Sequence, residues 1–196
     1  MMYIIRHGQT VWNLAKRKQG RKDSPLTLKG VEQAKWIAKL VQQEIETQDL
    51  KEYKIVISPQ WRCQQYASLI CEMLELDFMN CIVDQNLREH CFGLWEGKTE
   101  EEIEIEFPGF LETRYKEENY WNYIVPMDDA FAEAYGGYEG QKEIFICHEM
   151  VSKVMRGNLL DLNPSEVLPL KHKQNTIYKV NNLNVKTIKY NHNFME

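Results

Sequence analysis

Two alternating hydrophobic patterns constrain the fold of this chain more than any other feature of its sequence. Short runs typical of buried strands occur at 2–6, 53–58, 80–84, 143–147, 176–180 and 184–190. Segments with apolar residues at helical spacing lie at 24–45, 59–74, 99–107 and 149–162. Because strands that alternate with helices usually form parallel sheets covered on both faces, we expect a three-layer α/β fold with a mostly parallel central sheet flanked by helices. The last two strands are separated only by a turn around Asn181 and Asn182, which predicts a closing hairpin.

Several helix starts are indicated by residues that commonly cap helices. Thr27 and Thr99 each precede a helical segment, and a threonine hydroxyl can accept a hydrogen bond from the first free N–H groups. Ser58 followed by Pro59 predicts that the helix after the second strand begins at Pro59, since proline is favoured at the first helical position.

The length and composition of the chain favour one domain. Its 196 residues, 43% of them hydrophobic, are enough for one substantial core and fit a single domain over 1–196 better than two. Residues 107–141 differ from the rest, because prolines and glycines interrupt them and aromatic residues are dense. They could form a lid or insertion over a site, or a satellite cluster packed on the sheet, and the sequence does not favour either reading.

Charge and cysteine content exclude several kinds of partner. A net charge of −5 argues against nucleic-acid binding through a basic surface, and no segment is apolar enough for a signal peptide or a membrane span. We therefore expect a cytoplasmic protein. Its five cysteines form no C-x-x-C pair, which favours buried, reduced thiols over disulfides or a zinc site. The basic residues between Lys16 and Lys22 are interpreted as a solvated loop unless they border an anion site.

Cationic side chains follow three of the expected strands. Arg6 and His7 come at the end of the first strand, Arg62 lies in the helix after the second, and His148 follows the strand at 143–147. Ligands of open α/β sheets bind beyond the carboxyl ends of the strands, so these residues are expected to converge there. Gly8 would allow the chain to turn out of the strand. Two guanidiniums and two imidazoles near a helix N-terminus suit a phosphate group.

The segments "RHGQTVWN", "QGRKDSPLTLKGVEQA", "SPQWR", "LREHCFGLWEG" and "FICHEMVSKVMRG" occur in this order along most of the chain. Together they resemble the signature blocks of the histidine phosphatase superfamily, the phosphoglycerate mutase-like enzymes. The resemblance implies a phosphoglycerate mutase-like fold and a nucleophilic histidine, His7, that becomes phosphorylated. It assigns the phosphoryl clamp to Arg6, Arg62 and His148, and the proton donor to Glu89. Secondary contacts to phosphate or substrate are implied for Asn13, Gln19 and Gly20.

General chemistry agrees with these implied roles. Phosphoryl transfer depends mainly on fixed positive charges and an in-line nucleophile, and His7 must attack as a neutral imidazole. Glu89 must be protonated when an alcohol leaves, which requires burial or nearby carboxylates to raise its pKa. No carboxylate cluster in the sequence resembles a magnesium or zinc site, so we expect neither metal nor cofactor.

Two departures from the family pattern matter for function. Glu149 stands where the family normally has glycine after the second histidine, and we expect its side chain to point outward at the helix start, where it would complement the helix dipole. Only residues 141–143 separate "YGGYEG" from the strand "IFIC", whereas relatives usually have a helix there. One sheet face would then need cover from another segment, or the domain would be less stable.

The function expected first is metal-independent hydrolysis of small phosphomonoesters, because "FGLWEG" resembles the phosphatase branch of the family and the chain is short for a mutase. The alternatives are a phosphoglycerate mutase-type isomerase and a phosphate-binding regulatory protein that has lost catalysis. A small phosphorylated substrate is the expected partner, and the sequence leaves a homodimer open.

Overall fold

The computed structural model describes residues 1–109, 142–181 and 184–190. The lid or insertion expected at 107–141 therefore lies, beyond Gly109, outside the described residues. None of the described helices combines the length and the apolar character that crossing a bilayer requires.

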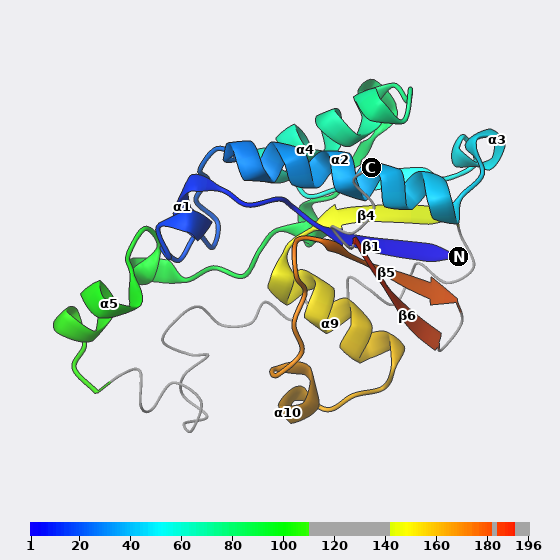
Figure 1. Ribbon diagram of the computed structural model, residues 1–196. Coiled ribbons are helices and arrows are strands. Elements are labelled where there is room, and N and C mark those ends of the chain that lie inside the picture. The colour runs from blue at the N-terminus through cyan, green and yellow to red at the C-terminus, as the bar shows by residue number, and fades with distance from the viewer. Residues whose placement is uncertain (110–141, 182–183, 191–196) are drawn as a thin grey trace.

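A six-stranded mixed sheet forms the centre of the molecule (Figure 1). Its strands are β1 (Met2–Arg6), β2 (Lys54–Ile57), β3 (Ile82–Val83), β4 (Glu143–Cys147), β5 (Thr176–Asn181) and β6 (Asn184–Lys189). They lie side by side in the order β3-β2-β4-β1-β5-β6. The first four are parallel, and β5 and β6 add an antiparallel hairpin next to β1. The expected strands, the closing hairpin and the mostly parallel α/β sheet are thus confirmed.

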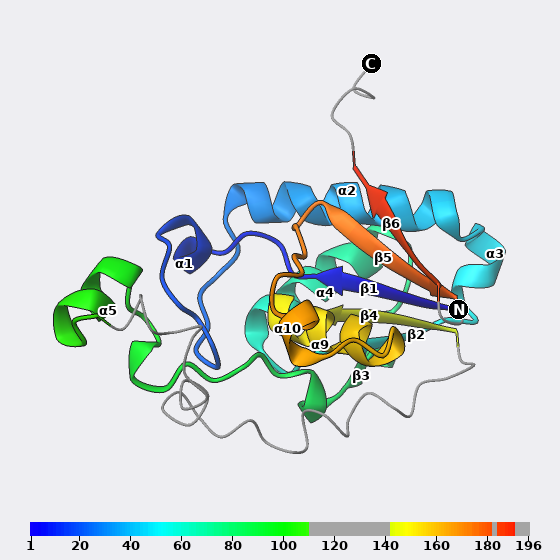
Figure 2. The ribbon, with the colours of Figure 1, turned by 90° about the horizontal axis from the view of Figure 1, so that it is seen from below.

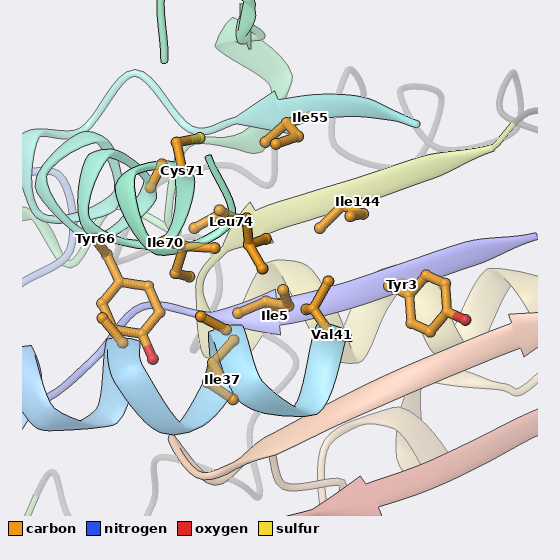
Figure 3. Close-up of a cluster of buried hydrophobic side chains, with 14 of the residues drawn as sticks. Tyr3, Ile5, Ile37, Val41, Ile55, Tyr66, Ile70, Cys71, Leu74 and Ile144 are labelled. Atoms are coloured by element: carbon orange, nitrogen blue, oxygen red, sulfur yellow. The ribbon is translucent and has the colours of Figure 1, made fainter. Parts of the chain in front are cut away.

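Two long helices cover one face of this sheet. They are α2 (Leu28–Glu44) and α4 (Trp61–Met73), and both lie above the strands in Figure 1. Their buried residues recur at helical spacing and pack on alternate residues of β1, β2 and β4, which point to the same face. Figure 3 shows this cluster, in which Ile37 and Val41 of α2 lie close to Ile5 of β1.

The opposite face is covered by α9 (Glu149–Leu159), next to which lies the short α10 (Pro164–Val167). Val151 and Met155 of α9 pack with Ile4, Val56 and Phe145, which are the residues that alternate with those facing α2. Phe145 is fully buried, so α9 supplies at least part of the cover that this face needs. Of the short connection at 141–143, where we expected no helix, Gln141 lies outside the described part of the chain and Glu143 already belongs to β4.

The remaining elements are short. They are α1 (Val11–Leu14), α3 (Thr47–Leu50), η1 (Phe78–Asn80), η2 (Gln85–Leu87), η3 (Gly93–Trp95) and α5 (Glu100–Glu106). Both α1 and α5 lie beyond the ends of the parallel strands, on the left of Figures 1 and 2. The connections that follow β1 and β3 therefore extend from this end of the sheet, whereas α3 lies at the other end.

Thr27 and Thr99 cap their helices as predicted, whereas the predicted start of α4 is wrong. The helix begins at Trp61, with Gln60 and not Ser58 at the N-cap position. Asp23, from a distant loop, accepts hydrogen bonds from the N–H groups of Trp61 and Arg62 at 2.9 and 3.3 Å. A carboxylate from elsewhere in the chain thus takes the role that was predicted for Ser58.

All five cysteines are free thiols, as expected. Cys63, Cys71 and Cys147 are buried, but Cys81 and Cys91 are only partly buried, which corrects the expectation for these two. Cys81 follows η1 and packs at the edge of the main core, and Cys91 lies in the loop before η3.

Candidate active site

The carboxyl ends of three neighbouring strands bring the two central histidines together. Arg6 of β1 pairs with Cys147 of β4, and the N–H of His7 donates to the carbonyl of Cys147 at 3.0 Å. The next residue on β4 is His148, whose ring centroid lies 5.2 Å from that of His7. The convergence predicted from the strand ends is therefore present in the structure.

Gly8, which follows His7, is needed for close packing. A Cβ at this position would lie 2.6 Å from the carbonyl oxygen of Gly30 in α2 and 2.6 Å from the ring of Tyr66 in α4. The bend after β1 therefore brings the backbone against both helices, and only a residue without a side chain fits there.

The ring of His7 is held in one orientation and one tautomer. Its Nδ1 lies 2.8 Å from the carbonyl oxygen of Gly8, which can only accept a hydrogen bond, so Nδ1 carries the proton. Nε2 is then left with its lone pair, and Arg62 Nε donates to it at 3.3 Å. Burial, followed by the charges of Arg62 and Arg6, holds the pKa of His7 well below its usual value. His7 is therefore a neutral imidazole whose unprotonated nitrogen, Nε2, accepts a hydrogen bond from Arg62 in this structure.

Arg62 is almost fully buried and is fixed by the loop before α2. Its Nη1 donates to the carbonyl of Lys22 at 2.8 Å and pairs with Asp23 Oδ1 at 2.6 Å. Its Nη2 donates to the carbonyl of Gly20 at 2.8 Å. These contacts hold the guanidinium next to His7, and its charge is paired with the partly exposed carboxylate of Asp23.

Arg6 contacts Glu149, which corrects the expected outward orientation of that carboxylate. Arg6 Nη1 lies 2.7 Å from Glu149 Oε2 and also donates to the carbonyl of His172 at 2.7 Å. The side chains of this ion pair are only partly exposed. The attraction of Arg6 therefore stabilises this orientation of the carboxylate more than full solvation would stabilise an outward one. His172 is buried, and its ring makes hydrogen bonds with the hydroxyl of Ser152 and the carbonyl of Thr176. These contacts fix His172, and with it the backbone carbonyl that accepts from Arg6.

His148 is buried beside His7. Its Nε2 lies 2.8 Å from the hydroxyl of Ser58 at the end of β2, and the thiol of Cys63 lies 3.5 Å from the same nitrogen. Burial, together with the charges of Arg62, His7 and Arg6, lowers the pKa of His148 well below its usual value. The site therefore holds two neutral imidazoles and two cationic guanidiniums.

Glu89 lies in an irregular segment between η2 and η3. Its backbone N–H donates to Gln60 Oε1 at 2.6 Å, and its carboxylate accepts from the N–H of His90 at 2.9 Å. Desolvation in the cavity raises the pKa of Glu89 despite the opposing effect of that N–H and of Arg62 and Arg6. A carboxyl group with a raised pKa can give up a proton near neutral pH.

These side chains share one cavity, with a volume of about 580 Å³. Arg6, His7, Arg62, Glu89 and Glu149 line it, whereas His148 is enclosed behind them and is not part of its wall. The implied contact residues Asn13, Gln19 and Gly20 also line the cavity.

Each contact residue is held by a neighbour. Asn13 Oδ1 accepts hydrogen bonds from the backbone N–H of Thr10 and the side-chain amide of Gln174, and Gln19 Oε1 accepts one from the hydroxyl of Ser24. The backbone of Gly20 has a positive φ of 55°.

The basic loop borders this cavity, so it is not simply a solvated loop. Lys16, Arg17 and Lys18 all line the cavity wall. Arg17 pairs with Glu102 at 2.6 Å and Lys18 with Glu100 at 2.7 Å, both carboxylates belonging to α5. These ion pairs tie the loop to α5 at the side of the cavity.

Two residues that organise the site were missed by sequence reasoning. Asp23 pairs with Arg62, and Gln60 links Gly20 to Glu89. Asp23 is 39 residues from Arg62 and Gln60 is 29 residues from Glu89, so no local spacing indicates these contacts. The described residues contain no group of three or more histidine, cysteine or acidic side chains placed to hold a metal ion.

Solved structures similar to this one include several phosphatases. The α-ribazole phosphatase from Shigella flexneri has a TM-score of 0.72 and 21% identity, with 97% of this chain and 95% of that chain covered. The phosphoserine phosphatase from Entamoeba histolytica, solved with phosphoserine, has a TM-score of 0.69 and 22% identity, with 97% and 96% covered. At these identities the likeness shows the fold, which is phosphoglycerate mutase-like.

Curated relatives match part of the chain. "Probable phosphoglycerate mutase GpmB" from Enterobacter sp. (strain 638) is 35% identical over 112 residues, which are 57% of this chain and 48% of that protein. The protein of the same name from Yersinia pestis (strain Pestoides F) is 38% identical over 97 residues, 50% of this chain and 41% of that protein. The match thus spans less than half the length of these relatives. The model of the histidine phosphatase superfamily, branch 1, matches residues 2–187, and the chain therefore belongs to this family.

Proposed function

We propose that this protein is a metal-independent phosphatase that hydrolyses small phosphomonoesters through a phosphohistidine at His7. The observation that carries this proposal is the state of His7, a neutral imidazole whose Nδ1 proton is held by Gly8 and whose Nε2 lone pair lies beside Arg62. An in-line nucleophile next to a fixed guanidinium is what phosphoryl transfer requires.

The first chemical step forms a bond between His7 Nε2 and phosphorus and breaks the bond between phosphorus and the ester oxygen. Arg6 and Arg62 stabilise the charge on the equatorial oxygens of the transferred group from the cavity wall, whereas His148, the third member of the proposed clamp, lies behind that wall in this structure. Glu89 gives its proton to the departing alkoxide, which leaves as the alcohol. Asn13, Gln19 and Gly20 contact the phosphate or the remainder of the substrate from the cavity wall.

The second step hydrolyses the phosphohistidine. A water molecule attacks phosphorus, Glu89 accepts its proton, and the phosphorus–nitrogen bond breaks to regenerate neutral His7 and orthophosphate. Burial and the two arginines keep His7 a good leaving group, because they favour its neutral form.

Two other functions are each favoured by one observation. The curated relatives are named phosphoglycerate mutases, and a mutase would return the phosphoryl group to a second hydroxyl and not to water. The contact between Glu149 and Arg6 favours a regulatory protein with weakened catalysis, since a carboxylate already occupies part of the proposed clamp. The phosphatases among the similar structures support hydrolysis as the first proposal.

A panel of phosphomonoesters, including phosphoserine and 3-phosphoglycerate, tests this proposal when assayed with excess EDTA. We expect release of orthophosphate from at least one ester at an unchanged rate with the chelator. Isomerisation of phosphoglycerate without phosphate release would favour the mutase. Activity lost in EDTA and restored by Mg²⁺ would contradict the metal-independent mechanism.

A further inference from the structure

Gln60 is a buried amide that bridges two walls of the cavity. It occupies the N-cap position of α4, but its side chain makes no hydrogen bond to the helix. Its Nε2 donates to the carbonyl of Gly20 at 2.7 Å, and its Oε1 accepts from the N–H of Glu89 at 2.6 Å. The two partners set the orientation of the amide, because a flipped amide would place donor against donor and acceptor against acceptor.

The bridge ties Glu89 to the same short segment that carries Arg62. Gln60 and Arg62 are two residues apart, and both donate to the carbonyl of Gly20, Arg62 from Nη2 at 2.8 Å. Glu89 itself lies in an irregular segment, where no helix or strand fixes its backbone. The start of α4 thus holds the phosphoryl clamp directly and the carboxyl group through one amide.

We propose that Gln60 is a positioning residue for proton transfer by Glu89. This inference rests on the proposed function, in which Glu89 protonates the leaving alkoxide. A general acid must reach hydrogen-bond distance of the leaving oxygen, and an error of about 1 Å in its placement can cost up to roughly 100-fold in rate. Loss of the bridge frees the backbone of Glu89 relative to His7 and Arg62.

The test compares an alkyl phosphate with 4-nitrophenyl phosphate, whose nitrophenolate leaves without a proton. Gln60→Met keeps the size of the side chain but removes both hydrogen bonds. The losses are compared in kcat/KM, which covers only the steps up to release of the alcohol, because Glu89 also acts in the second step, which both esters share. We expect kcat/KM for the alkyl ester to fall 10- to 100-fold and kcat/KM for the nitrophenyl ester to fall less than threefold. Gln64→Met is the matched control, because Gln64 lies one turn further along α4 and donates to the carbonyl of Pro59 at 2.6 Å. It should leave the ratio of the two rates unchanged.

A double-mutant cycle with Glu89→Gln separates positioning from general loosening of the structure. If Gln60 acts through Glu89, adding Gln60→Met to Glu89→Gln causes no further loss on the alkyl ester. Additive losses, or equal losses on both esters for Gln60→Met, would overturn the proposal. If Gln60→Met does not fold, Gln60→Asn retains the amide but shortens the side chain, and the same selective loss is expected from it.

The single variant Glu89→Gln distinguishes failure of this inference from failure of the proposed function. Selective loss on the alkyl ester for Glu89→Gln, without such loss for either Gln60 variant, would reject only the role of Gln60. Equal losses on both esters for Glu89→Gln would remove Glu89 from the acid role and reject the role of Gln60 with it.

Discussion

At the scale of single residues, the carboxylate of Glu149 changes what we expect of substrate binding. It lies 2.7 Å from Arg6 Nη1, so it competes with a phosphoryl oxygen for that arginine. Like charges about 6 Å apart repel by roughly 3 kcal/mol at an effective dielectric of ~20, before screening by salt. If Arg6 belongs to the proposed phosphoryl clamp, we expect this contact to weaken the binding of phosphate dianions there.

Replacing Glu149 with glutamine should strengthen the binding of phosphate-like anions. We expect Glu149→Gln to lower the inhibition constant for orthophosphate or vanadate at least tenfold, an effect of ~1.4 kcal/mol or more. Glu72→Gln is the control, because Glu72 is an exposed carboxylate of α4 outside the cavity wall. Inhibition constants that agree within twofold for Glu149→Gln, Glu72→Gln and the wild type would show that the carboxylate does not oppose the ligand.

Site residues could be predicted where the topology places them and not where distant loops meet. Arg6, His7 and His148 follow strands whose ends must share one edge of a parallel sheet, so their convergence follows from the order of the strands. The orientation of the Glu149 side chain depends on whether its carboxylate is solvated or pairs with Arg6. The spacing of residues along the sequence does not indicate which of the two occurs. Gln60 and Asp23 act through loops whose paths are set only by the folded tertiary structure.

At the scale of elements, the start of α4 is where the helix and the site depend on each other. The carboxylate of Asp23 accepts from two N–H groups of this helix and pairs with the buried Arg62. Removing an N-cap carboxylate typically costs ~1 kcal/mol, and a buried arginine that loses its charged partner adds to this cost. Stability and the orientation of Arg62 should therefore fall together.

We expect Asp23→Ala to lower the free energy of unfolding by about 1 to 3 kcal/mol and to reduce kcat/KM more than tenfold. Asp77→Ala is the matched control, because Asp77 caps the short η1 through the N–H of Met79 at 2.9 Å, in an exposed segment. It should cost less stability and leave kcat/KM unchanged. Denaturant unfolding and steady-state kinetics on both variants provide the comparison, and equal effects of the two variants would contradict this role of Asp23.

The strands and the long helices were predictable because hydrophobic periodicity depends only on neighbouring residues. The same local signal placed the start of α4 too early, since Ser58 and Pro59 resemble a typical helix start. In the folded chain, the hydroxyl of Ser58 lies against His148, and Asp23 caps the helix two residues later. Tertiary contacts therefore decided this boundary.

At the scale of the whole molecule, buried neutral histidines should make the protein sensitive to acid. Burial lowers the pKa of His7 and His148 strongly, that of His90 to about 4 and that of His172 to about 3. The unfolded chain binds protons at these side chains below a pH of ~6.5, whereas the native chain does not. Stability is then complete above that pH and declines as the pH falls toward the native pKa values, by up to ~1.4 kcal/mol per pH unit for each histidine.

His172→Gln measures one of these contributions. Glutamine can donate to the carbonyl of Thr176 and accept from Ser152, the two contacts of the His172 ring, but it does not titrate. Urea unfolding at pH 7 and pH 5 should show a smaller loss of stability for His172→Gln than for the wild type. Equal losses would mean that His172 is not kept neutral by the fold.

We expect His7 to carry the phosphoryl group during turnover, and a rapid-quench experiment can trap that group on the chain. The enzyme is mixed with a ³²P-labelled phosphomonoester, quenched in alkali and separated from free substrate. We expect label on the wild-type chain that survives alkali and is released by acid, as phosphohistidine does, and no such label on His7→Ala. Turnover of the ester without alkali-stable label on the wild type, or equal label on His7→Ala, would contradict it.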